Sequence, residues 1–375
     1  MIICTTASLL ITNSGLGNGY ISLWQTHIGA WTIENWINDA PMAIFFLLIG
    51  LELKRELYIG ELSDFRNASL PVVAAVGGMC LPALIHFAFN KGTPAQAGLG
   101  IPMATDIAFA LGALALVGNR VPASLRVFLT ALAVIDDLGA VIVIAVFYTA
   151  KVSLAYLIAA ILTFGLLIIL NRLRVVSLVL YLIGGVVIWY LMLKSGVHAT
   201  IAGVLLAFAI PFTGKEEDET SPSHQLEHLL QKPVAFIILP IFALANTGLL
   251  IGPRFLENLS AANSLGIILG LGIGKPLGIT VLSLFAIGIG LCRLPLDLNW
   301  KHLFGAGILG GIGFTMSIFI TNLAFANQTQ VINASKIAIL LASLIAGGVG
   351  FVWLKLFGKP ELADDDLDTI DFEGT

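Results

Sequence analysis

The chain has 375 residues, of which 58% are hydrophobic and only 11% are charged, and its formal net charge at pH 7 is −4. Soluble globular domains carry roughly 25% charged residues, so this composition excludes a water-soluble protein. The lysines and arginines form no basic stripe, which argues against a nucleic-acid partner. Cys4, Cys80 and Cys292 form no CxxC pair, so neither a disulfide framework nor a zinc site is expected. The main solvent of this chain is therefore membrane lipid.

The apolar segments predict an all-α membrane protein. A helix needs about 20 mostly apolar residues to cross a bilayer. Eleven such stretches occur in the chain, at residues 35–58, 69–90, 95–117, 124–149, 154–171, 176–194, 196–212, 229–251, 263–291, 302–326 and 332–357. A twelfth, residues 1–13, is too short to cross unaided, and we interpret it as an incomplete first helix. Residues 1–360 are thus expected to form a single integral membrane domain.

The distribution of lysine and arginine predicts the orientation of the chain. Thirteen of these residues, including Lys54 and Arg55, fall on one side of the predicted spans, and five, including Lys336, fall on the other. The richer side is expected to be cytoplasmic, which places both termini in the cytoplasm. The same side carries a charged loop at residues 215–223 and an acidic tail at residues 361–375, both typical of solvated segments.

Two adjacent acids, Asp136 and Asp137, interrupt the apolar run 124–149 near its middle. A charged residue at the centre of a bilayer costs roughly 2.5–3.5 kcal/mol, so it usually faces a cavity, pairs with an opposite charge or carries function. Successive helical residues point about 100° apart, so one carboxylate can face a cation while the other pairs with a base. The alternative is a polar pair with only a structural role.

A third acid, Asp106, lies where the run 95–117 is expected to break. Pro102 removes a helix donor, and Thr105 and Asp106 are both favourable helix N-caps. A new half-helix is therefore predicted to begin at Asp106, whose charge would balance the positive helix N-terminus. Thr105 offers a hydroxyl oxygen at the same place. The alternative is a capping aspartate with no role in binding.

Lys275 lies inside the predicted span 263–291 with apolar sequence on both sides, and a buried acid is its natural partner. The alternative is a lysine whose ammonium group reaches back to the membrane interface.

A second break is predicted in the glycine-rich segment 305–317, inside the run 302–326. The two broken runs are the fourth and the eleventh of twelve, each second in a group of three, which is the pattern of an inverted-repeat transporter with a site at mid-membrane.

Several motifs resemble the bacterial NhaA family of sodium/proton antiporters. They occur at residues 50–57, 104–112, 133–140, 195–200, 274–279 and 311–319. The resemblance implies twelve helices, with the fourth and eleventh discontinuous and crossing at mid-membrane. It also implies that the stretch 14–34 corresponds to an outward β-hairpin that joins two protomers into a homodimer.

The resemblance further implies roles for individual residues. Asp137 would be the direct ligand of Na⁺, with Asp136 and Thr105 beside it. Lys275 would pair with Asp136 and balance the C-termini of the half-helices, as Asp106 balances their N-termini.

Four residues match family positions tied to pH response, namely Glu52, Glu227, His228 and His198. From the sequence alone, His198 would also fit a histidine in the protein core that makes a hydrogen bond. His224 and His228 lie four residues apart, which suggests either a zinc site or, in our interpretation, a solvated helix face.

The function that follows is electrogenic, pH-regulated exchange of Na⁺ or Li⁺ for H⁺ in the bacterial inner membrane, by a protein that is not an enzyme and needs no cofactor. An intramembrane aspartyl protease is the rival, but its glycine-any-glycine-aspartate motif is missing before Asp136 and it has no use for Lys275. A passive cation channel would not explain the two broken helices.

Overall fold

The computed structural model describes residues 1–60, 62–63, 65–149, 152–213, 221–252, 255–326 and 328–358. Most of the predicted charged loop and the whole predicted acidic tail, residues 361–375, lie outside this part of the chain. The described residues are almost entirely helical, with a single pair of two-residue strands. They form two compact units, each assembled from three stretches of sequence. The single membrane domain over residues 1–360 stays a prediction.

Unit 1 comprises residues 1–63, 140–258 and 318–336. Its elements are α1 (Ile2–Thr12), α2 (Gly17–Gln25), β1 (His27–Ile28), β2 (Trp31–Thr32), α3 (Ile33–Tyr58), α7 (Leu154–Arg172), α8 (Leu178–Ser195), α9 (Ile201–Ala209), α10 (Pro222–Pro233), the π-helical turn η3 (Val234–Ile238) and α11 (Leu239–Asn246).

Unit 2 comprises residues 64–139, 259–317 and 337–375. Its elements are α4 (Phe65–Asn90), the 3₁₀ helix η1 (Pro94–Met103), α5 (Ile107–Val117), the 3₁₀ turn η2 (Gly118–Arg120), α13 (Ala262–Leu269), the π-helical turn η4 (Gly270–Gly274), α14 (Lys275–Gly288) and α15 (Trp300–Gly310). Four helices pass from one unit to the other, namely α6 (Ala123–Phe147), α12 (Phe255–Ser260), α16 (Phe314–Ala324) and α17 (Thr329–Phe357).

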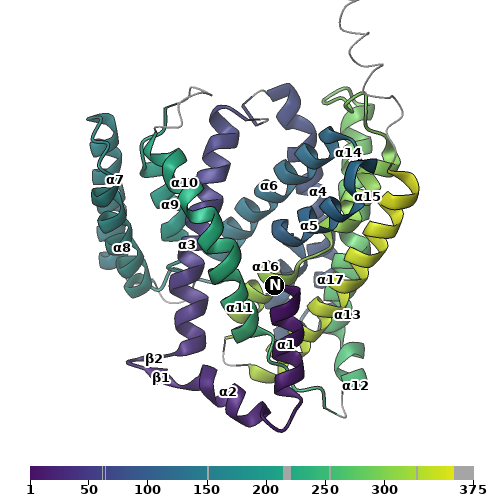
Figure 1. Ribbon diagram of the computed structural model, residues 1–375, viewed down its shortest axis with the longest axis horizontal. Coiled ribbons are helices and arrows are strands. Elements are labelled where there is room, and N and C mark those ends of the chain that lie inside the picture. The colour runs from purple at the N-terminus through teal and green to yellow at the C-terminus, as the bar shows by residue number, and fades with distance from the viewer. Residues whose placement is uncertain are drawn as a thin grey trace, which may run out of the picture. The chain divides into compact units, whose positions relative to one another are not determined.

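Helix α3 is the centre of unit 1 and packs along α9, while α7 and α8 form an antiparallel pair beside them (Figure 1). Thr32 caps the start of α3, because its Oγ1 accepts a hydrogen bond from the backbone N–H of Asn35 at 3.2 Å. The contact with α9 is close, since a Cβ atom at Gly203 would overlap the carbonyl oxygen of Ala43. Small residues of this kind let membrane helices approach without voids.

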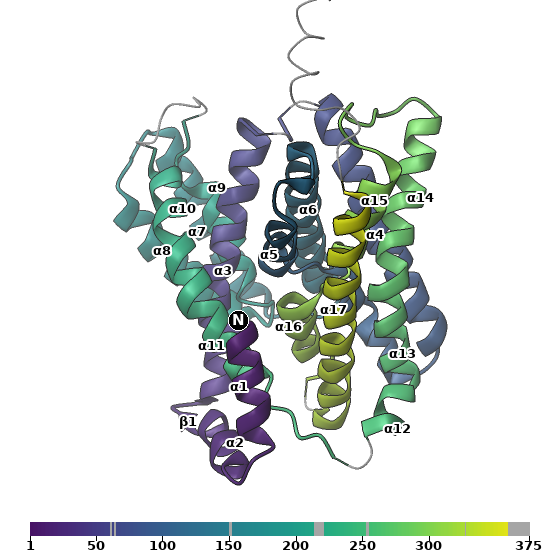
Figure 2. The ribbon, with the colours of Figure 1, turned by 45° about the vertical axis from the view of Figure 1, so that its right-hand side comes forward.

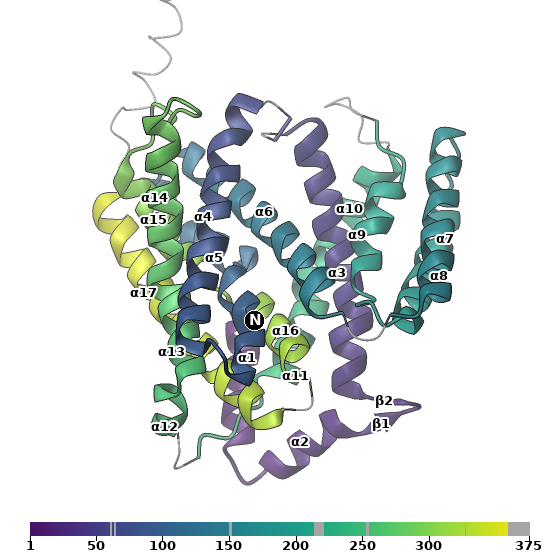
Figure 3. The same cartoon turned by 180° about the vertical axis from the view of Figure 1, so that it is seen from behind.

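In unit 2, α4 lies along the continuous line of α13, η4 and α14 (Figures 2 and 3). Two glycines make this crossing tight. A Cβ at Gly77 would overlap the carbonyl oxygen of Gly278, and a Cβ at Gly278 would overlap that of Gly77. The pair therefore fixes α14, which begins with Lys275, against α4.

The two broken spans predicted from the sequence are confirmed. The first consists of η1 and α5, bent by 40°, and the second of α15 and α16, bent by 46°. The second break falls at residues 311–313, at the end of the glycine-rich segment, and α15 runs unbroken through the earlier glycines.

The described residues contain eight helices long and apolar enough to cross a membrane, or ten if each bent pair counts as one span. The remaining predicted spans are the short first helix α1 and the run 196–212. In that run only the nine residues of α9 are helical. Gly196, with φ +84°, ends α8, and Pro211 lies two residues after the end of α9, so a long apolar run holds only a short helix.

The stretch 14–34 was interpreted as the family's β-hairpin, but most of its residues do not form strands. Residues 17–25 form the helix α2, and the strands are limited to two residues each, with His27 paired to Thr32 and Ile28 to Trp31. The poor alternation of polar and apolar residues in this stretch agrees with so short a hairpin.

Candidate ion-binding site

The first interruption is built around Asp106, which is the N-cap of α5. Its Oδ1 accepts a hydrogen bond from the backbone N–H of Phe109 at 3.1 Å. Ala104 before it is extended, with φ −80° and ψ 149°, so the chain leaves η1 and starts α5 afresh. The local signals of Pro102 and two capping residues therefore predicted this break correctly.

The two interruptions contact each other directly. The backbone N–H of Asp106 donates to the carbonyl oxygen of Ile312 at 2.6 Å. Oδ2 of Asp106 accepts from the backbone N–H of Thr315 at 3.1 Å and from the hydroxyl of the same threonine. The hydroxyl of Ser317 donates to the carbonyl oxygen of Ile101 at 2.7 Å. These bonds satisfy backbone groups that neither broken helix can satisfy itself.

Lys275 and Asp136 form an ion pair in which both side chains are 0% exposed. Thr105 completes this group. Its Oγ1 accepts a hydrogen bond from Lys275 Nζ at 3.0 Å. The same hydroxyl lies 2.8 Å from Asp136 Oδ2 and 2.9 Å from the carbonyl oxygen of Gly310, and it donates its single proton to one of these two oxygens. Because Gly310 ends α15, the ammonium of Lys275 lies close to a helix C-terminus, where positive charge is favourable.

The backbone around Lys275 is specialised. The π-helical turn η4 directly precedes it, and Pro276 follows it. Such turns inside longer helices are frequent at functional sites. Here the turn, together with the Gly77–Gly278 crossing, places the lysine beside Asp136.

Asp137 is the next residue along α6 and is 1% exposed. Within the described part of the chain, no hydrogen bond reaches the second carboxylate oxygen of Asp136, Oδ1. Two adjacent buried carboxyl groups, with a hydroxyl and a carbonyl oxygen beside them, are the hard oxygen ligands that alkali-metal cations and protons both seek. The structure thus brings together Thr105, Asp136 and Lys275 through hydrogen bonds and an ion pair. Asp106 follows Thr105 in sequence, and Asp137 follows Asp136.

Three of the four residues matched to pH response lie together in unit 1. Glu227 Oε1 forms an ion pair with Arg55 Nη1 at 2.9 Å. Glu52 lies within electrostatic range of Glu227, and His228 does so as well. His198 lies elsewhere, with its Nε2 2.8 Å from the carbonyl oxygen of Tyr148. That contact matches the alternative of a core histidine with a hydrogen bond.

Two of the lysines that were used to predict the orientation are buried. Lys54 is 3% exposed, and its Nζ donates to the carbonyl oxygens of Ala207 and Phe208 at 3.2 Å each and to that of Ile210. It caps the C-terminus of α9. Lys336, counted on the side opposite to Lys54, is 4% exposed and lies in α17 among polar side chains of unit 1. Their burial depends on partners that are distant in sequence, which hydropathy does not register.

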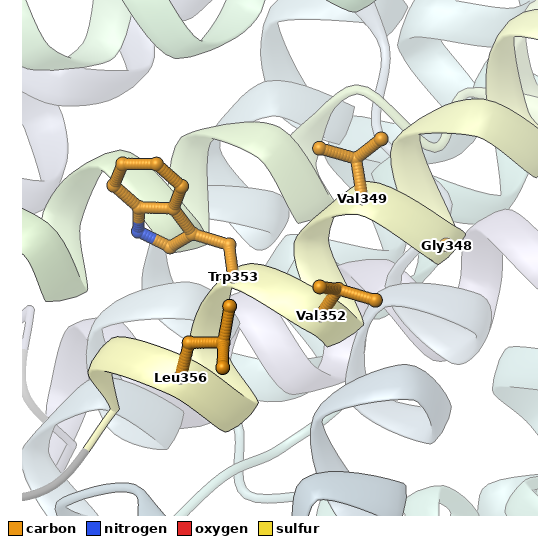
Figure 4. A pocket seen from close by; sticks show the side chains of 5 residues that line it. All are labelled: Gly348, Val349, Val352, Trp353 and Leu356. Atoms are coloured by element: carbon orange, nitrogen blue, oxygen red, sulfur yellow. The ribbon is translucent and has the colours of Figure 1, made fainter.

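A shallow groove of about 290 Å³ runs along α17 (Figure 4). It is lined by Gly348, Val349, Val352, Trp353 and Leu356. The one polar atom of these side chains, Trp353 Nε1, already donates to the carbonyl oxygen of Lys301 at 2.9 Å. The groove therefore offers an ion nothing to bind. Among the described residues, no group of three or more His, Cys, Asp or Glu side chains could hold a metal ion.

A helical membrane chain with buried charges at the contact between two interrupted helices has the architecture of a secondary ion transporter. The family described as Na⁺/H⁺ antiporter 1 matches residues 1–354, and the chain belongs to this family.

Similar proteins carry the same description. The Na⁺/H⁺ antiporter NhaA of Dechloromonas aromatica is 67% identical over 95% of this chain and 92% of its own length. The NhaA of Cytophaga hutchinsonii is 57% identical over 97% of this chain and 94% of its length. The NhaA of Vibrio parahaemolyticus is 48% identical over 97% and 95%, respectively.

Proposed function

We propose that this protein exchanges Na⁺ for H⁺ across the bacterial inner membrane, with Asp136, Asp137 and Thr105 as the shared binding site. The observation that carries the proposal is the fully buried Asp136–Lys275 pair at the contact between the two interrupted helices. Family membership supports the same ions as cargo. The transported cations include Li⁺, which seeks the same oxygen ligands.

Competition between protons and a metal ion is enough for exchange. When the carboxyl groups are protonated, their oxygens no longer attract a cation. When they ionise, they bind a dehydrated Na⁺, with carboxylate and hydroxyl oxygens in place of water. Rocking of one helix bundle against another then opens the site to the opposite side.

Lys275 and Asp106 set the charge of the site. With Lys275 paired, Asp136 and Asp137 together carry one net negative charge beyond the ammonium, which suits a monovalent cation. Asp106, already bound by Thr315 and Phe109, balances the helix N-termini and takes no part as a cation ligand.

The cycle is electrogenic if more than one proton moves for each cation. Asp136 and Asp137 supply two carboxyl groups for one Na⁺, so that two protons can be exchanged for each cation. Protons entering the cell would then expel Na⁺ or Li⁺, driven in part by the membrane potential.

Regulation by pH is assigned to Glu52, Glu227 and His228, with His198 as a separate element. The Arg55–Glu227 ion pair and the nearby Glu52 form a group whose charge changes when Glu52 or Glu227 takes up a proton. In Glu227→Gln, we expect the midpoint of the pH–activity curve to move while the maximal rate is retained. An unchanged midpoint would remove Glu227 from this role.

For the orientation, assembly and chemistry of the protein, we keep the predictions made from the sequence. Both termini lie in the cytoplasm, lipid surrounds the helices, and two copies associate as a homodimer. The reaction involves no covalent step and no resident cofactor, so the protein acts as a carrier and not as an enzyme.

Proton flux in proteoliposomes, triggered by added Na⁺, tests the proposal. Wild-type protein should move protons on addition of Na⁺, and Asp137→Asn should abolish the flux because the ligand that also carries the proton is gone. Asn171→Ala, which alters an unrelated hydrogen bond to the carbonyl oxygen of Ala209, is the matched control. Normal exchange by Asp137→Asn would refute the assignment.

A further inference from the structure

A buried polar cluster in unit 1 shares no residue with the candidate ion-binding site. Its centre is Asn246, the last residue of α11, which is 1% exposed. Its Nδ2 donates to Asn38 Oδ1 at 2.7 Å and to the carbonyl oxygen of Phe242 at 3.0 Å. Its Oδ1 accepts from Asn322 Nδ2 at 2.7 Å and from Lys336 Nζ at 3.2 Å. An amide has two donor hydrogens and two acceptor positions, so every one of them is used.

Two of these partners come from one segment, residues 318–336, which we call the strap. The chain passes from unit 2 to unit 1 after Ser317 and returns after Lys336. The strap therefore contains the end of α16 and the beginning of α17, while the remainder of both helices belongs to unit 2. Lys336, its last residue, also lies 3.7 Å from Glu34 Oε1.

Helix α16 is held at both of its ends. At its start, Thr315 donates to Asp106 and Ser317 donates to the carbonyl oxygen of Ile101, both in unit 2. Near its end, Asn322 donates to Asn246 in unit 1. A helix of 11 residues acts as a short rigid rod, so a displacement at one end reaches the other.

Packing alone does not account for this cluster. A buried ammonium surrounded by neutral amides, with its carboxylate partner at 3.7 Å, is a costly arrangement compared with apolar side chains of the same size. Polar groups retained at such a place fix one arrangement of the elements that they join.

We propose that Asn246, Asn322 and Lys336 are positioning residues for transport that anchor the strap to unit 1. The rigid helix α16 then conveys the position of the strap to Asp106. The functional half of this inference rests on the proposed antiport. The structural half, the anchoring itself, does not.

The test uses full-length protein and two measurements. Hydrogen exchange over residues 318–326 and 328–336 reports anchoring, and Na⁺-triggered proton flux in proteoliposomes gives kcat and the KM for Na⁺. In Asn322→Leu and in Lys336→Met we expect strap amides to exchange about tenfold faster or more, since local opening no longer breaks these bonds. We expect kcat to fall about fivefold or more and KM to stay within about twofold, because no cation ligand has changed.

Conservative and unrelated changes are the controls. Lys336→Arg keeps the charge and a donor and should restore most of kcat. Asn171→Ala lies in unit 1 outside the strap and should change neither measurement. If Asn322→Leu does not reconstitute, Asn322→Ser removes the same amide with less change in volume.

The proposal is overturned if strap exchange is unchanged, if exchange accelerates without a loss of kcat, or if KM rises with kcat intact. If wild-type protein shows no Na⁺-dependent flux, the proposed antiport fails and the positioning role fails with it. The exchange measurement would still decide whether the cluster anchors the strap.

Discussion

Asp106 accepts hydrogen bonds from both the backbone N–H and the hydroxyl of Thr315, and so joins the first interrupted span to the second. The same carboxylate caps α5 through the backbone N–H of Phe109. One carboxylate thus lies at the N-termini of two helices, each carrying about half a positive charge. Its geometry is that of a residue that holds the contact between the broken helices, beside the site where Asp136 pairs with Lys275.

Thr315→Val should loosen this contact without removing any cation ligand. Valine has a similar volume but no hydroxyl, so one bond to a buried carboxylate is lost. We expect the free energy of unfolding to fall by about 1–2 kcal/mol. Thermal unfolding of the purified protein measures this. Thr315→Ser keeps the hydroxyl and should lie close to wild type, and equal loss in both variants would contradict the assigned bond.

Lys275→Met should destabilise the protein more than the double variant Lys275→Met/Asp136→Asn does. The single change leaves a buried carboxylate without its ammonium, for which typical costs are about 3–5 kcal/mol. Removing the second charge relieves part of that cost. Unfolding measurements on the two single variants and the double variant give the coupling. Additive effects would show that the pair contributes nothing as a pair.

Gly278→Val should displace α14 from α4, because its side chain would overlap the carbonyl oxygen of Gly77. We expect a loss of stability of about 2 kcal/mol or more and a large loss of transport, since Lys275 begins the same helix. Gly112→Val is the matched control, as a Cβ there meets no atom within 4 Å. Full transport by Gly278→Val would mean that this crossing does not position the lysine.

Lys54→Met should destabilise α9, whose C-terminal carbonyl oxygens would lose their cap. The expected loss is about 1–3 kcal/mol, the usual effect of leaving buried acceptors unbonded. The KM for Na⁺ should stay unchanged. Thermal unfolding and flux assays measure the two quantities, with exposed Lys232→Met as the control. A change in KM alone would point to a role in cation binding instead.

The sequence predicted those features of the site that depend only on neighbouring residues. The break at Asp106 followed from a proline and two capping residues, and capping is decided within a few positions. The buried acids and Lys275 were evident because charge inside an apolar run is unusual. The resemblance to the NhaA family supplied the pairing of Lys275 with Asp136, two residues that lie 139 positions apart in the sequence.

What the sequence did not reveal depends on distant partners. Lys54 binds a carbonyl oxygen 156 residues away, and Lys336 binds Asn246, 90 residues away, so the sequence served only to count both lysines toward the orientation. The sequence did not reveal the partners of Asn38, Asn246 and Asn322, because an isolated polar residue in an apolar helix does not indicate which residue it contacts. One clue was present: all three interrupt predicted spans, where a buried amide needs hydrogen bonds.

The competition of Na⁺ and H⁺ for one set of oxygens is tested most directly by Na⁺ binding to the purified protein in weakly buffered solution over a pH series. The account predicts that bound Na⁺ releases protons, and that the apparent Na⁺ affinity falls about tenfold to a hundredfold for each unit of decreasing pH where the site titrates. Asp136→Asn/Asp137→Asn should show neither effect. Na⁺ binding that released no protons, or that persisted unchanged in the double variant, would contradict the account.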